Sequence, residues 1–301
     1  MNNIQDTFSI KDLENLTGIK AHTIRIWEKR YNLLEPNRTE TNIRYYDLNN
    51  FQKLLNVSYL NNNGYKISKI AKLDADKIPE LVRKIADEAD AENHALNSFK
   101  LAMVNFDQTL FYKTYNSLEK EKTFEEIFYE VFIPLLSEIG LLWQTNTITP
   151  AHEHFISILV RHKILINTEL IQASQVNKST KIFVLYLPDN EIHELGLMFI
   201  NHQLVKYGYH SIFLGQSVPI ESLAELQSYY DEITFISYFT VKPERENLEA
   251  YLEDFENTIL NNSKNNLWIL GQMINALNID ELPKGIRRFD SIQNLIKEIK
   301  A

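Results

Sequence analysis

The chain has 301 residues, of which 44% are hydrophobic and 24% charged, an ordinary balance for a globular protein of two or three domains. It contains no cysteine, which excludes disulfides, iron–sulfur clusters and cysteine-based zinc sites. No apolar run approaches the ~20 residues that span a bilayer, and the first residues lack the pattern of a signal peptide, so we expect a cytoplasmic protein with no membrane partner.

The net charge of −9 is unevenly distributed along the chain. Residues 1–75 carry 11 Lys and Arg against 8 Asp and Glu, whereas residues 76–301 carry 20 against 32. A mildly basic head on an acidic body favours an anionic partner for the head alone. Chance differences of a few charges between small domains are the alternative explanation.

The segment from about residue 7 to residue 73 has the pattern of a helix–turn–helix followed by a hairpin. A short helix is expected after Ser9, which can cap it together with Asp12, and Gly18 then allows a tight turn. A second helix follows, with apolar residues at 3–4 residue spacing. Residues 37–47 predict a two-stranded hairpin with a polar tip, and two further short helices are expected after it.

The remaining chain divides into a helical part and an alternating part. Residues 76–178 show helical periodicity throughout, which predicts a bundle of four helices at about 76–90, 91–120, 123–144 and 150–174. From residue 179, short continuous apolar runs alternate with helical stretches, as buried parallel strands and their crossover helices do. We therefore expect a doubly wound, flavodoxin-like α/β domain, with a fifth strand near residues 286–289 and a final helix after it.

Polar side chains of the second head helix and of the hairpin are candidates for contacts with nucleic acid. Arg25 can reach a phosphate or a guanine edge. Arg38 and Arg44 lie on opposite strands of the expected hairpin, so both can bind phosphates. The alternative is an amphipathic helix pair whose polar face is merely solvated.

This segment resembles the winged helix–turn–helix of the MerR transcription regulators. A T-G turn is followed by T-[IL]-R-x-[WY]-E, then L-L-x-P-x-R, then R-x-Y, and all four pieces occur in this order. The resemblance implies double-stranded operator DNA as the partner, bound by a dimer. It implies the DNA contacts Thr23, Arg25, Arg38 and Arg44. One departure is Lys20, where the family often has a serine as helix cap.

His193 follows the first expected strand of the α/β domain, with carboxylates at Glu191 and Glu194. It lies at the edge of the sheet where such domains bind ligands. The sequence lacks a GxSxG elbow, a GxGxxG after the first strand and a P-loop. A metal ligand oriented by Glu191, a general base and a residue that merely begins a helix therefore remain open for His193.

The same stretch resembles the cobalamin-binding fold. The pattern of that fold is [DE]-x-H-x-x-G, then about 41 residues to S-x-[LV], then G-G. The matching residues are Glu191, His193, Gly196, Ser237 and Gly271. The departures are Phe239 in the last place of S-x-[LV] and Gln272 in place of the second glycine.

The resemblance implies that His193 replaces the nucleotide base of the cofactor as the lower ligand of cobalt, with Glu191 as its partner. By the same resemblance Gly196 and Gly271 leave room for the displaced nucleotide tail, and Ser237 contacts it. The long side chain of Gln272 is expected to crowd that tail. Glu194, which we expect one residue inside the helix, is not assigned a role.

Upstream, Trp143 is followed after nine residues by Glu153 and His154. This spacing is the signature of the cap in MerR-type cobalamin photoreceptors that repress carotenoid genes. The resemblance implies that Trp143 packs over the upper axial group, with Glu153 and His154 beside it. The alternative is that Trp143 belongs to the bundle core and the pair is incidental. Light-sensing members often carry histidine after the tryptophan, where this chain has Gln144, so light sensing stays open.

These patterns together predict a regulator rather than an enzyme. The expected domains are a MerR-type winged helix–turn–helix over 1–75, a capping helical bundle over 76–178 and a cobalamin-binding domain over 179–301. We expect a repressor whose assembly, as a homodimer or tetramer, and operator binding depend on cobalamin, most plausibly adenosylcobalamin, with light as a further candidate signal. The alternatives are a cofactor-independent repressor whose last domain serves dimerisation or docking of an antirepressor protein, and, less favoured, a corrinoid carrier for methyl transfer.

Overall fold

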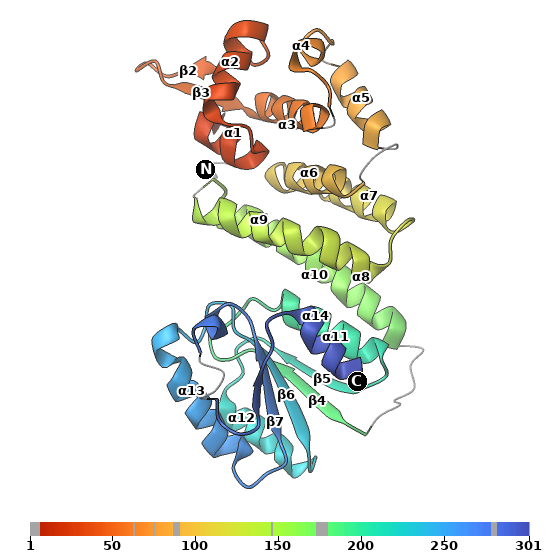
Figure 1. Cartoon of the computed structure of the whole chain (residues 1–301), viewed down its shortest axis with the longest axis vertical. Coiled ribbons are helices and arrows are strands. Elements are labelled where there is room, and N and C mark those ends of the chain that lie inside the picture. Colours follow the sequence, from red (N-terminus) through yellow and green to blue (C-terminus); the bar gives the residue numbers. More distant parts are fainter. Residues whose placement is uncertain are drawn as a thin grey trace. The chain divides into compact units, whose positions relative to one another are not determined.

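A computed structural model describes most of the chain, namely residues 7–62, 64–74, 76–86, 91–145, 147–172, 180–277 and 282–300 (Figure 1). The chain forms two compact units, Met1–Leu159 and Val160–Ala301. The boundaries expected at 75/76 and 178/179 stay predictions, because residues 75, 178 and 179 lie outside the described ranges. No helix within those ranges is long and apolar enough to cross a membrane.

The first unit opens with the expected helix–turn–helix. Helix α1 (Ile10–Thr17) begins with a capping box, in which Ser9 Oγ accepts from the Asp12 N–H at 3.2 Å and the Asp12 carboxylate accepts from the Ser9 N–H at 2.7 Å. Gly18 ends α1 with a φ of 74°, a left-handed conformation that glycine adopts without strain. Helix α2 (Ala21–Tyr31) follows this turn.

A three-stranded antiparallel sheet adjoins these helices. Strand β3 (Arg44–Asp47) lies between β1 (Thr7–Phe8) and β2 (Asn37–Arg38). The hairpin of β2 and β3 agrees with the sequence analysis, whereas β1 has too few residues to show a periodicity. Helix α3 (Leu48–Asn62) and the single turn α4 (Ile67–Ile70) are the two further helices expected.

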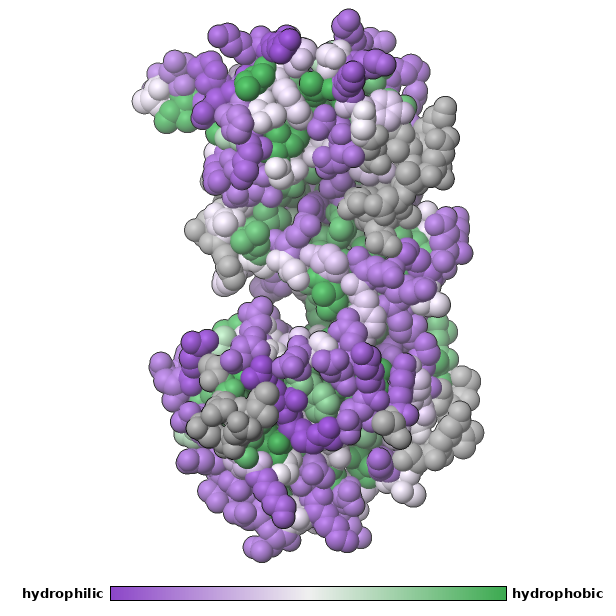
Figure 2. Space-filling model, in the orientation of Figure 1, coloured by the Kyte–Doolittle hydropathy of each residue, from purple (hydrophilic) through white to green (hydrophobic). Residues whose placement is uncertain are grey.

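Apolar side chains of the helices and of β3 form the core of this part of the chain. The buried members include Leu13, Leu16, Ile24, Trp27, Tyr46, Phe51 and Leu54. Burial of a large apolar side chain contributes about 1.5–3 kcal/mol, so the apolar stripes of α1 and α2 face inward and their polar faces stay outside. On the face of the molecule seen in Figure 2, hydrophilic residues predominate in both units and apolar residues are scattered among them.

The helical part of the first unit breaks at a place that the sequence analysis did not predict. Residues 91–120, expected as one helix, form α6 (Ala91–Val104) and α7 (Gln108–Leu118). Phe106 takes a φ of 52° between them, and Asp107 caps α7 by accepting from a backbone N–H. The expectation was wrong because the residues of this turn continue the helical pattern of apolar positions.

Helix α5 (Lys77–Ala86) packs on α3, and four helical segments follow it. They are α6, α7, the pair α8 (Phe124–Ile127) and α9 (Ile133–Gln144) joined by the π-helical turn η1 (Phe128–Phe132), and α10 (Pro150–Gln172). An aromatic cluster joins α6, α7 and η1 through Phe99, Phe111, Tyr115 and Phe132.

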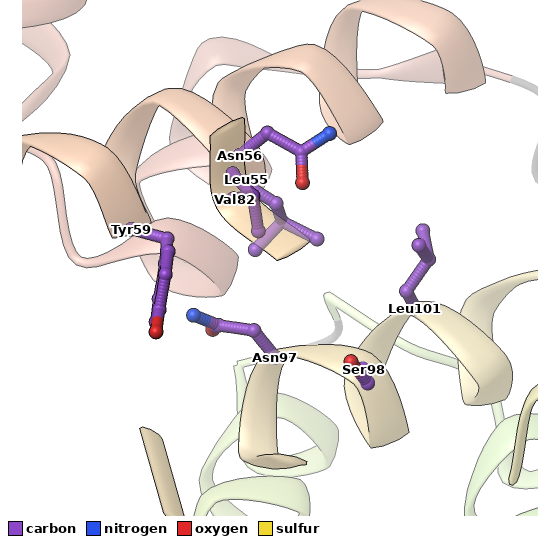
Figure 3. A pocket seen from close by; sticks show the side chains of 7 residues that line it. All are labelled: Leu55, Asn56, Tyr59, Val82, Asn97, Ser98 and Leu101. Carbon is purple, nitrogen blue, oxygen red and sulfur yellow. The ribbon is translucent and has the colours of Figure 1, made fainter. Parts of the chain in front are cut away.

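A small cavity lies between α3, α5 and α6 (Figure 3). Its lining residues are Leu55, Asn56, Tyr59, Val82, Asn97, Ser98 and Leu101. Its volume of about 30 Å³ suits a water molecule rather than an organic ligand. None of the site residues expected from the sequence lines it.

The second unit contains the expected doubly wound α/β domain. Its parallel five-stranded sheet has the order β5–β4–β6–β7–β8. The strands are β4 (Ile182–Tyr186), β5 (His210–Gly215), β6 (Ile233–Tyr238), β7 (Asn266–Leu270) and β8 (Ile286–Arg288). This is the flavodoxin-like order, in which the winding direction reverses between β4 and β6. The carboxyl ends of these two strands therefore border the ligand crevice typical of such sheets.

Helices cover both faces of this sheet (Figure 1). Helices α11 (Leu195–Lys206) and α14 (Ile292–Lys300) contact each other on one face, and α12 (Ile220–Ala224) and α13 (Leu248–Phe255) lie on the other. Short irregular turns complete the domain at η2 (Glu225–Ser228), η3 (Arg245–Asn247), η4 (Glu256–Leu260) and η5 (Met273–Ala276).

Gly271 directly follows β7, and the backbone of Phe239 lies close against it. Its φ is 118°, and a Cβ there would lie 2.2 Å from the carbonyl oxygen of Phe239. We expect Gly271→Ala to lower the free energy of unfolding of the full chain by about 2–3 kcal/mol, because that carbonyl is fixed by the Met273 N–H. Urea unfolding followed by circular dichroism measures the change.

Gly140 provides the matched control, because it lies inside α9 and an added Cβ would meet no heavy atom within 4 Å apart from the neighbouring backbone of its own helix. We expect Gly140→Ala to leave stability unchanged or to raise it by up to about 1 kcal/mol, since alanine favours helices. Equal effects of the two substitutions would contradict the close approach at Gly271.

Candidate DNA-binding face and corrinoid site

Helix α2 presents a basic face to solvent. Ile24 and Trp27 are buried, whereas the opposite face exposes His22, Arg25, Ile26, Lys29 and Arg30. Thr23 is partly exposed beside them. Phosphates and guanine edges are the groups that such cations bind, so this face can contact a nucleic acid.

The start of α2 is capped by a residue from the preceding helix. Lys20 makes no side-chain cap, as its departure from serine suggests. The Glu14 carboxylate instead accepts from the Ala21 N–H at 3.2 Å and pairs with Lys20 Nζ at 3.2 Å. These bonds lower the pKa of Glu14, so it stays ionised at the positive end of the helix dipole.

The hairpin is fastened to α2 through Glu28. This carboxylate pairs with Arg44 Nε at 3.2 Å and accepts a hydrogen bond from the buried phenol of Tyr46. Arg38 lies directly opposite Arg44 in the strand ladder, and its Nη1 donates to Asn42 Oδ1 at 2.7 Å. The structure thus brings Arg38 and Arg44 together on one hairpin and ties that hairpin to α2. Sequence reasoning missed Glu28, although it is the last letter of T-[IL]-R-x-[WY]-E.

The three residues expected in the cap lie on α9 and α10. Trp143 is 54% exposed, so it is not a residue of the bundle core. Glu153 accepts from Ser157 Oγ at 2.6 Å, and its second oxygen lies 3.1 Å from His154 Nδ1. The side chain of Gln144 lies outside the described part of the chain.

Glu191 is the centre of the site at the carboxyl edge of the sheet. Its side chain is fully buried. One carboxylate oxygen, Oε2, accepts from the three successive backbone N–H groups of residues 240–242 at 2.7–3.2 Å. The other, Oε1, accepts from the N–H groups of Ile192 and His193 and lies 2.6 Å from His193 Nδ1. The carboxylate therefore joins the loop after β4 to the loop after β6, at the point where the winding reverses.

These bonds determine the charge of Glu191 and the orientation of His193. Burial alone would raise the pKa of the Glu191 carboxyl. The hydrogen bond with His193 and the backbone N–H groups outweigh burial and lower this pKa to about 2. An anionic carboxylate thus holds the imidazole through Nδ1, the arrangement in which a histidine coordinates a metal through Nε2. The sequence suggested the partnership of Glu191 but not the three N–H groups from the distant loop.

Glu194 has more contacts than the sequence suggested. It is the residue before α11 rather than one inside it, and it is 5% exposed. Its Oε1 lies 2.8 Å from Nε of Arg161, a residue of the same compact unit. Burial raises the pKa of Glu194, while Arg161 and Gln216 act in the opposite direction. The pair anchors the entry to α11.

Ser237 faces away from α11. It pairs with Tyr186 in the ladder of β4 and β6, and the Tyr186 phenol accepts from Tyr251 Oη of α13 at 3.0 Å. The buried Oγ of Ser237 makes no hydrogen bond of normal geometry, although its proximity lowers the pKa of the Tyr186 phenol against the larger raising effect of burial. Successive side chains of a strand point to opposite faces, so Tyr238 points to the face of α11.

Tyr238 occupies the space beside Gly196 in the first turn of α11. A Cβ on Gly196 would lie 2.8 Å from Cε2 of the Tyr238 ring and within 3.2 Å of two more ring atoms. The side chain beside Gly196 is therefore that of Tyr238 and not that of Ser237, and a shared contact of Gly196 and Ser237 with one nucleotide tail stays a prediction. A step of one residue along a strand changes the face, and sequence spacing alone did not resolve that step.

The residues fit the cobalt of a cobalamin without any change. They fit its nucleotide tail only after a rearrangement of side chains. The lower-ligand position fits, because His193 is oriented by a buried carboxylate. Space for a nucleotide tail beside α11 is filled by the Tyr238 ring, and Gly271 is closed by its neighbouring backbone. Gln272 is exposed, and the crowding of the tail expected from it stays a prediction.

Comparison with known proteins finds family matches for the head and for the helical part that follows it, and relatives that cover most of the chain. The family described as "MerR HTH family regulatory protein" matches residues 8–77, and the family described as "B12 binding domain" matches residues 95–166. The chain is similar to the HTH-type transcriptional repressor CarH of Myxococcus xanthus, with 30% identity over 223 residues that cover 72% of this chain and 73% of that protein. It is also similar to the HTH-type transcriptional repressor CarA of Myxococcus xanthus, with 24% identity over 220 residues, 72% of this chain and 71% of that protein.

Among solved structures, the monomethylamine corrinoid protein of Methanosarcina barkeri is similar with a TM-score of 0.58 and 12% identity. The similarity covers 71% of this chain and 98% of that one. At this identity it shows the fold alone.

The hydrogen bonds of Glu191 predict an acid dependence of stability. Because the pKa of Glu191 is lowered from its ordinary value of 4.5 to about 2, the carboxylate stabilises the folded state fully above pH 4.5, and this contribution is lost as the pH falls toward 2. We expect Glu191→Gln to lower the free energy of unfolding at pH 7 by about 3 kcal/mol and to remove this part of the acid dependence. Urea unfolding between pH 2.5 and 7, without added corrinoid, measures both effects.

Glu249→Gln on the exposed surface of α13 is the control, for which we expect no change beyond about 0.5 kcal/mol. The same pH profile for Glu191→Gln as for the unmodified chain would show that the Glu191 bonds do not stabilise the fold.

Proposed function

This chain belongs to the MerR HTH family of transcriptional regulators that carry a B12-binding domain, and on that premise we propose how its parts act together. It is a DNA-binding regulator with a cobalamin-binding domain and not an enzyme. We propose a repressor with three domains: residues 1–75 bind operator DNA, residues 76–178 cap the cofactor, and residues 179–301 hold it from below.

The proposed DNA contacts are Thr23, Arg25, Arg38 and Arg44. Arg25 and Thr23 lie on the outward face of α2, which is the element that enters the major groove in helix–turn–helix proteins. Arg38 and Arg44 bind phosphates from the hairpin. The ion pair of Arg44 with Glu28 uses Nε, and a guanidinium has five N–H groups, so the remaining ones serve the phosphate.

The cofactor proposal is carried by one observation, the buried Glu191 carboxylate that fixes His193 at the winding-reversal edge of the sheet. When bound, cobalamin supplies a cobalt ion whose lower position accepts an imidazole nitrogen. We propose that His193 Nε2 fills this position and that adenosylcobalamin is the physiological form. Trp143, Glu153 and His154 are the proposed contacts of the upper axial group, and the exposure of Trp143 supports such a contact. Gly196, Ser237 and Gly271 are the further proposed cofactor contacts.

Regulation then requires that the cofactor favours one assembly over another. We propose a homodimer or homotetramer whose formation depends on the bound cofactor, with light and an antirepressor protein as further inputs. Exposed apolar side chains at helical spacing on α10 support self-association, namely Ile158, Leu165, Ile166 and Leu170.

A second function is favoured by the Tyr238 ring at Gly196. In this alternative the chain is a cofactor-independent repressor, and the α/β domain serves dimerisation or antirepressor docking. Purification from cobalamin-supplemented cells decides between the two. A bound corrinoid with visible absorption supports the cobalamin-dependent repressor. A colourless protein that does not bind added corrinoids supports the cofactor-independent repressor.

Arg25 is the proposed DNA contact that can be removed with the least effect on folding, because its side chain is exposed. We expect Arg25→Ala to weaken binding to the DNA fragment upstream of the protein's own coding sequence by about 10- to 100-fold at constant salt. Fluorescence anisotropy measures the affinity. Lys297→Ala on the exposed surface of α14 removes the same charge outside the head and should leave affinity unchanged. Equal affinities for the two variants would contradict a contact by Arg25.

His193 is tested by its effect on the spectrum of the cofactor. We expect His193→Ala to bind adenosylcobalamin at least 10-fold more weakly and without the absorption change that marks an imidazole on cobalt. Titration in the dark, followed by illumination and size-exclusion chromatography, measures binding and assembly together. His210→Ala, at the start of β5, is the control that should retain both. Unchanged affinity and spectrum for His193→Ala would exclude this histidine as the ligand.

A further inference from the structure

Tyr238 lies against Gly196, in the first turn of the helix that follows the loop of the proposed cobalt ligand His193. In cobalamin the lower face of the corrinoid carries a tethered nucleotide, whose benzimidazole base is itself a ligand of the cobalt. If His193 takes the cobalt, the displaced base remains tethered on the same side and must lie in the domain that carries His193. Space for it has to open around the His193 loop and the start of α11.

The first turn of α11 has one position without a side chain, Gly196, three residues after His193. The Tyr238 ring fills that space, with Cε2, Cδ2 and Cζ at 2.8, 3.1 and 3.2 Å from the position of a Cβ on Gly196. Distances this short mean that the ring lies directly against the glycine, so no further group fits between α11 and β6 at this level.

Hydrogen bonds hold the backbone next to Tyr238, so rotation of its side chain is the smallest change that opens the space. The next residue, Phe239, donates its N–H to the Leu270 carbonyl at 2.7 Å and accepts from the Met273 N–H at 3.1 Å. Gly271 is held against Phe239 by the same contacts. Tyr238 is half-buried, and this burial raises the pKa of its phenol.

We propose that Tyr238 makes this protein discriminate between corrinoids that carry a nucleotide on their lower face and corrinoids that lack it. A corrinoid without the nucleotide, of the cobinamide class, binds to His193 with Tyr238 in place. Cobalamin binds only after the ring has rotated away from Gly196. Tyr238 is thus a specificity-determining residue that does not touch the cobalt, and this role rests on the proposed function of His193 as the cobalt ligand.

The test compares aquocobinamide and aquocobalamin on the full chain by visible titration in the dark. Cobalamin must also give up its own base–cobalt bond, so a preference of the unmodified protein for cobinamide is not sufficient. The test therefore compares the ratio of cobalamin affinity to cobinamide affinity between the variants and the unmodified protein. We expect Tyr238→Ala to bind cobalamin at least 10-fold more tightly than the unmodified protein, with cobinamide affinity changed less than 3-fold. Tyr238→Phe, which keeps the ring, should retain the original ratio.

Two further variants distinguish a change in corrinoid binding from a change in folding. Tyr238→Leu keeps an apolar side chain and should give an intermediate gain for cobalamin. Tyr229→Ala removes a tyrosine that is 75% exposed and should change neither affinity. Far-ultraviolet circular dichroism and cobinamide affinity report the folding of each variant.

The outcomes separate the two proposals. An equal affinity ratio for the unmodified protein and both Tyr238→Ala and Tyr238→Leu, with both corrinoids bound, overturns the role of Tyr238 and leaves His193 as the ligand. Failure of the unmodified protein and of every variant to bind either corrinoid overturns the cofactor proposal, and the discrimination with it.

Discussion

The buried carboxylate of Glu191 is the interaction on which the geometry of the α/β site depends. It accepts from three successive N–H groups of residues 240–242 and holds His193 Nδ1 at 2.6 Å. A buried charge is stable only when hydrogen bonds replace the lost water, and here the protein supplies all of them. The consequence is that two loops after neighbouring strands cannot move independently, and the imidazole is preorganised before any ligand binds.

In the DNA-binding head, too, a carboxylate joins two elements of the structure. Glu28 of α2 holds Arg44 and Tyr46 of the hairpin, so the helix that would enter the major groove and the hairpin that would contact phosphates form one rigid element. Both functional ends of the chain therefore depend on an acidic side chain that does not itself meet the ligand. Two of the carboxylates of the head, Glu14 and Glu28, are paired with basic groups of the head itself, which reduces their repulsion of an anionic partner.

A step of one residue along β6 decides which side chain faces which helix. Ser237 and Tyr238 are neighbours in β6, yet one side chain faces α13 and the other α11. The face of α11 is the one that carries Gly196, and there the strand presents an aromatic ring instead of a hydroxyl. The two proposals therefore rest on different residues: cobalt ligation on His193 with Glu191, and the choice between corrinoids on Tyr238.

The sequence by itself determined the order of domain types, the helix–turn–helix with its hairpin, the five parallel strands and the position of His193 at a strand end. These features follow from local periodicity, caps and turns, which are written in neighbouring residues. The tertiary structure alone decided the break at Phe106, the burial of Glu194, the N–H groups that hold Glu191 and the face on which Ser237 lies. Each of these depends on which distant segments meet and on the side to which a side chain points, and neither is encoded in the spacing along the chain.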